Sequence, residues 1–158
     1  MNGNLQMLRL ELRSDCDAFS ARVDELAGLT LHAGTDDANL LARAAVALHH
    51  AYGAFESALA RIARVFDTEP SGANWHRSLL ETMAIEVPGV RPLVVGPRTL
   101  AATRDMLAFR HFFRHAYTVP LDPRRLATLR DVAVQVRPFV VADFAAVDAW
   151  LAGLADRV

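Results

Sequence analysis

The chain of 158 residues contains no lysine and only one cysteine, Cys16. A single cysteine excludes a disulfide within the chain, and its place on an apolar helical stripe indicates a buried structural thiol rather than a nucleophile. No apolar run approaches the roughly 18 residues of a membrane span, and the N-terminus lacks a signal-peptide pattern. We therefore expect a cytoplasmic protein with no membrane partner.

Because lysine is absent, all 17 basic side chains counted as permanent cations are arginines. A GC-rich genome suffices to explain this choice, but guanidinium groups also bind phosphate in a bidentate way that ammonium groups do not. Residues 1–96 hold 8 arginines and 12 acidic residues, whereas residues 97–138 hold 8 arginines and 3 acidic residues. Although the whole chain has a net charge of −1, residues 97–138 therefore form a basic segment.

Strand patterns are missing as well, since no period-2 alternation, internal repeat or low-complexity tract occurs. The length and the 53% apolar content predict one helical domain over residues 1–158 that buries a core. Apolar residues recur every three or four positions. This spacing predicts helices over residues 4–27, over a second stretch whose apolar stripe runs from Leu41 to Phe66 after candidate caps at 35–37, and over residues 74–86. Residues 87–96 are rich in proline and glycine and predict an ordered irregular connection.

A fourth helix is predicted over about 97–118, because Pro97 suits the first helical position and Pro120 disfavours helix at the residue before it. Asp122 followed by Pro123 predicts the start of a fifth helix, which Pro138 should kink or divide. The fold class expected from these elements is all-α, an up-down bundle of four or five helices.

The most informative segment is Arg-His-Phe-Phe-Arg-His-Ala-Tyr at residues 110–117, at the end of the fourth predicted helix. It places Arg110, His115 and Tyr117 in an R-x4-H-x-Y arrangement. Cleaving RNA without a metal requires a base for the 2′-hydroxyl, a cation for the phosphorane oxygens and an acid for the leaving 5′-oxygen. An imidazole that titrates near about 6.5 can serve as acid or base. Arg110 can hold the phosphate, and Arg114 is a second candidate cation.

Helical geometry constrains how these side chains act together. At about 100° per residue Arg110 and Tyr117 share a face, whereas Arg110 and His115 lie roughly 140° apart. One regular helix would not direct both toward one phosphate. Either the regular helix ends after Arg114, or two protomers assemble the site. We favour a two-fold homodimer in which paired motif helices form a basic cleft.

Two other interpretations of the segment stay open at this point. His111 and His115 have the i, i+4 spacing of two helical zinc ligands, but third ligands are scarce nearby and no H-E-x-x-H pattern occurs, so we expect no metal. The simplest alternative is a helix of surface arginines with two half-buried histidines.

Tyr52 and Glu56 lie one turn apart on the second predicted helix. A polar residue on the apolar stripe of a bundle needs a partner. Glu56 either faces the motif helix and orients Arg110 or His115, or it is an ordinary paired charge beside a core tyrosine. His76 has no visible partners in the sequence.

Residues 109–117 resemble the core motif of HEPN ribonucleases, specifically HepT-like toxins. The likeness extends to Trp75-His76-Arg77, to residues 87–92 and to Leu121-Asp122. The resemblance implies an α-helical homodimer that cuts tRNA or mRNA with no metal or other cofactor. The arginine, histidine and tyrosine of the family motif fall on Arg110, His115 and Tyr117.

The resemblance also implies a partner. Such toxins are often encoded beside a minimal nucleotidyltransferase antitoxin, in a type VII-like pair, and in some members this partner transfers AMP onto the motif tyrosine, here Tyr117. The added bulk and negative charge would lie where the RNA phosphate must bind. We expect a metal-independent endoribonuclease toxin; the alternative is a non-catalytic helical module or regulatory subunit that docks a nucleotidyltransferase.

Overall fold

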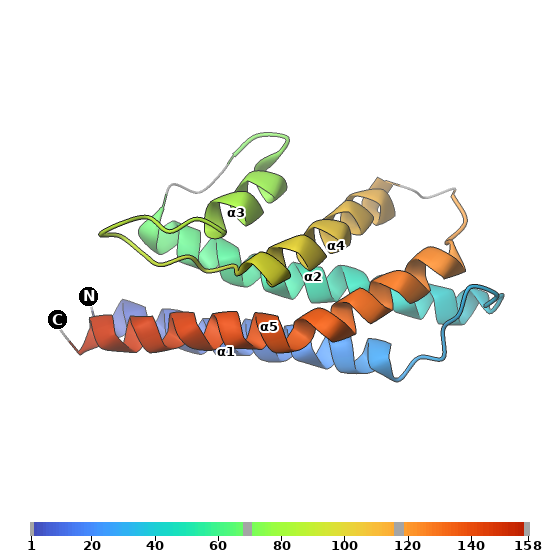
Figure 1. Cartoon of the computed structure of the whole chain (residues 1–158), viewed down its shortest axis with the longest axis horizontal. Coiled ribbons are helices and arrows are strands. Elements are labelled where there is room, and N and C mark those ends of the chain that lie inside the picture. The colour runs from blue at the N-terminus through green and yellow to red at the C-terminus, as the bar shows by residue number, and fades with distance from the viewer. Residues whose placement is uncertain (1, 68–70, 116–118, 157–158) are drawn as a thin grey trace.

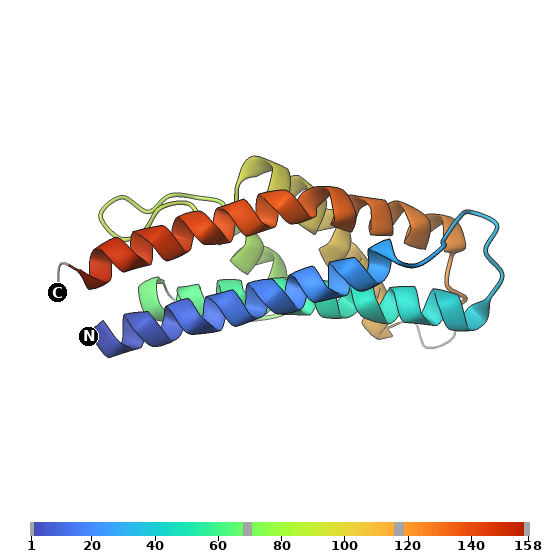
Figure 2. The same ribbon diagram turned by 90° about the horizontal axis from the view of Figure 1, so that it is seen from below.

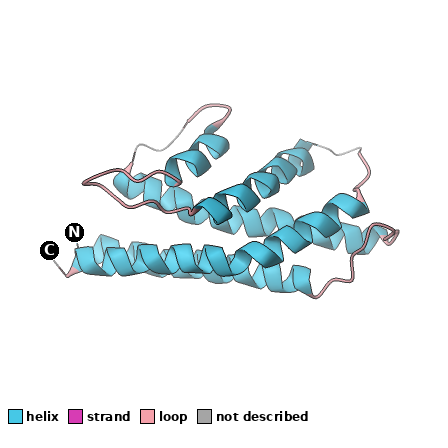
Figure 3. Ribbon diagram, in the orientation of Figure 1, coloured by secondary structure: helices cyan, strands magenta, loops and turns pink. Residues whose placement is uncertain are grey.

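The computed structural model describes residues 2–67, 71–115 and 119–156 and contains five helices in that part (Figure 1). The helices are α1 (Asn2–Ala27), α2 (Ala38–Phe66), α3 (Trp75–Met83), α4 (Pro97–His115) and α5 (Pro123–Ala155). Figure 3 shows only helices and loops over the described residues. One isolated β-bridge joins Val87 and Arg91 in the connection before α4. The expected all-helical class is confirmed.

Local capping explains where two of the helices begin. The Asp37 carboxylate accepts hydrogen bonds from the backbone N–H groups of Asn39 and Leu40, and the Asp122 carboxylate accepts one from Arg124. These bonds satisfy N–H groups that the first turn of a helix leaves without a carbonyl partner. The predicted starts of α2 and α5 are therefore confirmed together with their caps.

Helix α3 is shorter than predicted and ends at Met83 rather than at residue 86. The carbonyl of Met83 accepts hydrogen bonds from the backbone N–H groups of Val94 and Val95, at 2.8 and 3.0 Å. Both valines are buried. Their return toward α3 occupies the carbonyl that the next helical turn would have used, so the helix stops there.

Pro138 does not divide α5, so that part of the prediction is wrong. The proline lies on the exposed side of the helix, while Val136 and Val140 beside it are buried. A proline removes one backbone hydrogen bond, and an exposed carbonyl can bond to water instead. Packing of the flanking valines holds the two halves as one helix, which changes direction along its length in Figure 1.

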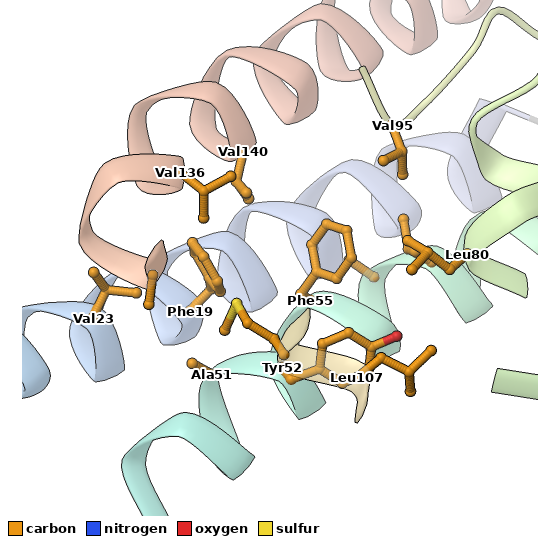
Figure 4. Packing of buried hydrophobic residues seen from close by; sticks show 14 of the residues in the cluster. Phe19, Val23, Ala51, Tyr52, Phe55, Leu80, Val95, Leu107, Val136 and Val140 are labelled. Carbon is orange, nitrogen blue, oxygen red and sulfur yellow. The ribbon is translucent and has the colours of Figure 1, made fainter. Parts of the chain in front are cut away.

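Three long helices form the main body of the structure. Helices α1 and α2 run in opposite directions, and α5 runs back beside α1 (Figure 2). Their aromatic side chains meet in the centre, where the rings of Phe55 and Phe144 stack with centroids 5.9 Å apart and Phe19 packs on Phe55. Figure 4 shows Phe19, Phe55 and Val140 converging from the three helices. Helix α4 lies across α2 and α5, and α3 contacts α2 and α4.

Among the described helices, α5 alone is long and apolar enough, by length and composition, to cross a membrane. One such helix is weak evidence, because a core helix of a folded protein passes the same test. Helix α5 places a buried stripe against the other helices, and its Asp148 pairs with Arg9 and Arg13 of α1 at 2.8 Å each. These contacts make α5 a packing element of this fold.

The connection between α3 and α4 is ordered by a buried arginine. Arg91 is 3% exposed and its Nε and Nη2 atoms lie 2.7 and 3.1 Å from the carboxylate of Asp67. Its guanidinium also donates to the carbonyls of Thr82, Ile85 and Pro92. A buried charge needs such full pairing. The arrangement ties the residue that follows α2 to the end of α3 and to the connection that leads to α4.

Candidate functional site

The start of the motif helix α4 is held by α5. The carboxylate of Asp143 accepts the Gly96 N–H at 3.0 Å and the Thr99 hydroxyl at 2.6 Å. A Cβ atom on residue 96 would lie 2.9 Å from an Asp143 oxygen, so glycine permits this approach. Further along α4, buried Met106 and Phe109 fix the face that points into the core. The direction and rotation of α4 therefore follow from its packing on α5 and α2.

One residue from each of three helices meets in a buried group, Glu56 of α2, His76 of α3 and Arg110 of α4, which we call the arginine cluster. Arg110 Nη2 lies 3.3 Å from Glu56 Oε1, and His76 Nδ1 lies 2.7 Å from Glu56 Oε2. The side chains of Glu56, His76 and Arg110 are 8, 10 and 11% exposed. Because burial penalises an unpaired charge, the carboxylate and the guanidinium each depend on the other for stability.

The guanidinium of Arg110 lies over the face of the His76 ring. Its Nη1 atom is 3.1 Å from Nδ1 and 3.2 Å from Nε2. If Nη1 lay in the plane of the ring at nearly equal distances from Nδ1 and Nε2, it would overlap the ring carbons. Nη1 therefore contacts the face of the ring. The indole of Trp75, with its centroid 3.7 Å from the imidazole, then occupies the opposite face. Since the Glu56 carboxylate accepts from Nδ1–H, the neutral His76 ring has its proton-free nitrogen at Nε2.

Three buried polar atoms around the arginine cluster have no hydrogen-bond partner among the described residues: Tyr52 Oη, His49 Nδ1 and Arg110 Nε. The guanidinium carbon of Arg110 lies 6.0 Å from the centroid of the Tyr52 ring. Burial, with a further contribution from the Glu56 charge, raises the pKa of Tyr52 well above its usual value. Burial also lowers the pKa of His49, and the nearby Arg110 charge adds to that effect. Tyr52 and His49 are therefore uncharged at neutral pH.

The last two turns of α4 present His111, Arg114 and His115 on the exposed surface. His115 Nδ1 lies 2.8 Å from the carbonyl oxygen of His111, one turn earlier. A carbonyl only accepts, so Nδ1 carries the proton of the neutral ring and Nε2 is the nitrogen able to take one. Burial, followed by the charges of His76 and Arg110, lowers the pKa of His111.

The structure places the predicted site residues in two groups. Arg110, Glu56 and Tyr52 come together inside, whereas Arg114 and His115 lie on the surface. Helix α4 extends through His115, and the alternative in which the helix frays after Arg114 stays a prediction. Of the two partners considered for Glu56, the structure brings Arg110 to it. The third motif residue, Tyr117, lies outside the described residues.

His76 is the site residue that the sequence did not reveal. The sequence showed no partners for it, whereas in the structure it contacts both Glu56 and Arg110. A signal was present, because His76 shares the buried face of α3 with Leu79, Leu80 and Met83, at i, i+3, i+4 and i+7. A polar residue on such a face needs a polar partner from another element.

In the part of the chain that the structure describes, no further ligands are available for a zinc ion on His111 and His115. There, no three His, Cys, Asp or Glu side chains gather in a group that could hold a metal ion. The pair formed by His111 and His115 has no third ligand among those residues.

Comparison with known families identifies the relationship. A family model described as HepT-like protein matches residues 43–151, which is more than half of the chain. Comparisons with curated proteins and with solved structures give no match. The matched segment includes Glu56, His76, Arg110 and His115, so the arginine cluster and the exposed histidine both lie inside it. The chain belongs to the HepT-like protein family.

Proposed function

We propose that this HepT-like protein is a metal-independent endoribonuclease toxin that cleaves tRNA or mRNA in the cytoplasm. The observation that carries the proposal is that the chain itself orients both Arg110 and His115, the two residues at the family motif's arginine and histidine positions. Glu56 and His76 hold the arginine, and the His111 carbonyl holds the histidine. The basic composition of residues 97–138 adds support, because an RNA backbone attracts a positive surface.

The chemistry assigned to His115 follows from its tautomer. Its Nε2 atom takes the proton of a 2′-hydroxyl, and the 2′-oxygen attacks the adjacent phosphorus. The bond from phosphorus to the 5′-oxygen breaks, and that oxygen takes a proton from a second, protonated imidazole. The products are a 2′,3′-cyclic phosphate and a 5′-hydroxyl end. Each step uses only proton transfers and the cation that offsets phosphorane charge.

The second imidazole is the reason for proposing a homodimer. Arg110 points into the fold and His115 points out of it, so one chain does not direct both at the same phosphate. A two-fold axis that pairs the ends of two α4 helices brings a second motif to the cleft. His115 of the partner subunit then supplies the acid while the first acts as base.

Arg114 and Arg110 have different roles in this proposal. Arg114 is exposed and contacts the RNA backbone directly. The terminal nitrogens of Arg110 are engaged by Glu56 and His76, and its Nε–H is the donor without an acceptor in the described chain. Because that Nε atom is buried in the folded chain, we propose that Arg110 acts on the bound phosphate through its positive charge rather than through a direct hydrogen bond.

We further propose that a minimal nucleotidyltransferase antitoxin neutralises the protein by transferring AMP to Tyr117, in a type VII-like pair. Tyr117 follows His115 by two positions in the sequence. The transferred phosphate would place negative charge where the RNA phosphate binds.

The decisive experiment compares wild type with His115→Ala on total tRNA, with a chelator present. We expect wild-type protein to produce fragments with cyclic phosphate ends, and the variant to cut at least about 100-fold more slowly, as loss of a general acid–base group does. His32→Ala, an exposed histidine in the loop before α2, is the matched control and should cut like wild type. Equal RNA loss in wild type and His115→Ala would exclude catalysis by His115. No loss in either, with binding to the nucleotidyltransferase retained, would favour the non-catalytic module.

A further inference from the structure

Between α3 and α4 lies an open cavity of about 340 Å³ that the proposed cleavage chemistry does not use. Its apolar walls come from Leu80 of α3 and from Leu107 and Ala108 of α4. Known small-ligand sites have roughly 300 to 1,000 Å³ and combine apolar walls with a few polar groups. The cavity therefore has the size and lining of a small-ligand site.

The rim of the cavity carries more positive than negative charge. Arg77 Nε donates to Glu81 Oε1 at 3.0 Å, and Arg104 Nη2 lies 3.8 Å from the same oxygen. The two arginine side chains are 75 and 56% exposed. Exposed ion pairs contribute little to stability, so a phosphate oxygen can compete with Glu81 for either guanidinium. Two cations sharing one carboxylate leave a net attraction for an anion at this rim.

One end of the cavity adjoins the arginine cluster. His111 lines the cavity and its ring meets the edge of the His76 ring, with centroids 5.4 Å apart. His76 in turn contacts Arg110, so a single residue separates His111 from the guanidinium assigned to the scissile phosphate. A group bound in the cavity would thus be a neighbour of that phosphate along the strand.

An unpartnered polar atom lies beneath the same walls. The Tyr52 side chain is 1% exposed and its hydroxyl has no hydrogen-bond partner among the described residues. Figure 4 shows this hydroxyl pointing toward Leu107 and Leu80. Tyr52 is not among the residues that line the cavity, so its hydroxyl lies behind the leucine walls and a ligand in the cavity does not reach it in this arrangement.

We propose that this cavity binds one nucleotide of the RNA substrate, with the base between the apolar walls and its phosphate on Arg77 and Arg104. The proposal rests on the proposed ribonuclease function. Proteins that read single-stranded RNA take bases out of the stack and place them against apolar or planar side chains, with arginine on the backbone. Occupancy of the cavity would therefore give the enzyme a base preference next to the cut.

The binding test uses a His115→Ala background, so that the RNA stays intact, and a fluorescently labelled single-stranded oligoribonucleotide. Ala108→Trp fills the cavity from α4, and Ala101→Trp, about two turns earlier on the exposed side of the same helix, does not line it. We expect the first change to weaken binding about tenfold, the scale of one lost base contact, and the second to leave it unchanged. Thermal unfolding of both variants, each at an exposed alanine, verifies that they fold.

A second pair of variants separates the cavity from general electrostatics. Arg104→Ala and Arg98→Ala each remove one cation from α4, but Arg98 lies over the Phe139 ring of α5, away from the cavity. Arg104→Ala should weaken binding by several times more than Arg98→Ala. In the catalytically competent protein, sequencing of the cut ends should show that Ala108→Trp alters the base preference beside the cut.

The outcomes distinguish this proposal from the proposed function. If wild type cuts no RNA but Ala108→Trp still weakens oligonucleotide binding, the cleavage chemistry fails and the nucleotide site stands. If wild type cuts RNA and all four variants bind and cut alike, the nucleotide site is overturned and the chemistry stands. Loss of nucleotidyltransferase binding in Ala108→Trp with unchanged RNA binding would also overturn it, by assigning the cavity to a protein partner.

Discussion

Replacing Glu56 by glutamine tests whether charge holds the arginine cluster together. The change keeps the side-chain shape but removes the negative charge that lies 2.7 Å from His76 Nδ1 and 3.3 Å from Arg110 Nη2. Removing one member of a buried ion pair costs about 3–5 kcal/mol. The amide oxygen of glutamine retains one neutral hydrogen bond, worth about 1 kcal/mol. We therefore expect the free energy of unfolding to fall by about 2–4 kcal/mol.

The measurement is urea unfolding followed by circular dichroism, with the protein concentration held constant because a dimer would make stability depend on it. Glu25→Gln is the matched control, since it breaks an exposed pair with Arg22 at 2.9 Å. That change should cost less than about 1 kcal/mol. A loss for Glu56→Gln that is no larger than the loss for Glu25→Gln would refute the view that a buried charge pair fixes Arg110.

Three further predictions concern other parts of the molecule. Asp143→Ala removes the acceptor for Gly96 and Thr99 and should lower the free energy of unfolding by about 1–2 kcal/mol, as loss of a helix cap does; unchanged urea unfolding would contradict this. The pKa of His49 in the folded state lies below the ordinary 6.5, so as pH falls the unfolded chain binds a proton at this histidine before the folded chain does. The free energy of unfolding is therefore unaffected by His49 well above that pH and decreases as pH falls below it. His49→Gln should then flatten the fall of unfolding free energy between about pH 7 and 5, and a slope equal to that of wild type would count against it. After incubation with ATP and the nucleotidyltransferase, wild type should gain the mass of AMP and Tyr117→Phe should not; a gain in the variant would exclude Tyr117 as sole acceptor.

Local patterns predicted most of the fold. The spacing of apolar residues and the carboxylates of Asp37 and Asp122 placed the starts of α2 and α5 because these signals act within a few residues. The end of α3 could not be found in that way. Its last carbonyl is taken by Val94 and Val95, which return from a connection that no local rule positions.

Local patterns also predicted part of the candidate site. Glu56 stands on an apolar stripe, which signals a polar partner, and Arg110 on the motif helix was one of two partners considered. Choosing between Arg110 and His115 required the rotation of α4, which depends on its packing. His76 needed the position of α3 as well, and that position follows from the buried Arg91 and its bonds to Asp67.

The support that α4 receives from Asp143 also bears on the order of events during synthesis. The carboxylate that holds the start of the motif helix comes from a residue 47 positions after Gly96. A nascent chain that has not yet exposed Asp143 from the ribosome can form the helix but lacks this contact. The geometry of the motif helix is therefore completed only after the part of α5 that carries Asp143 has emerged.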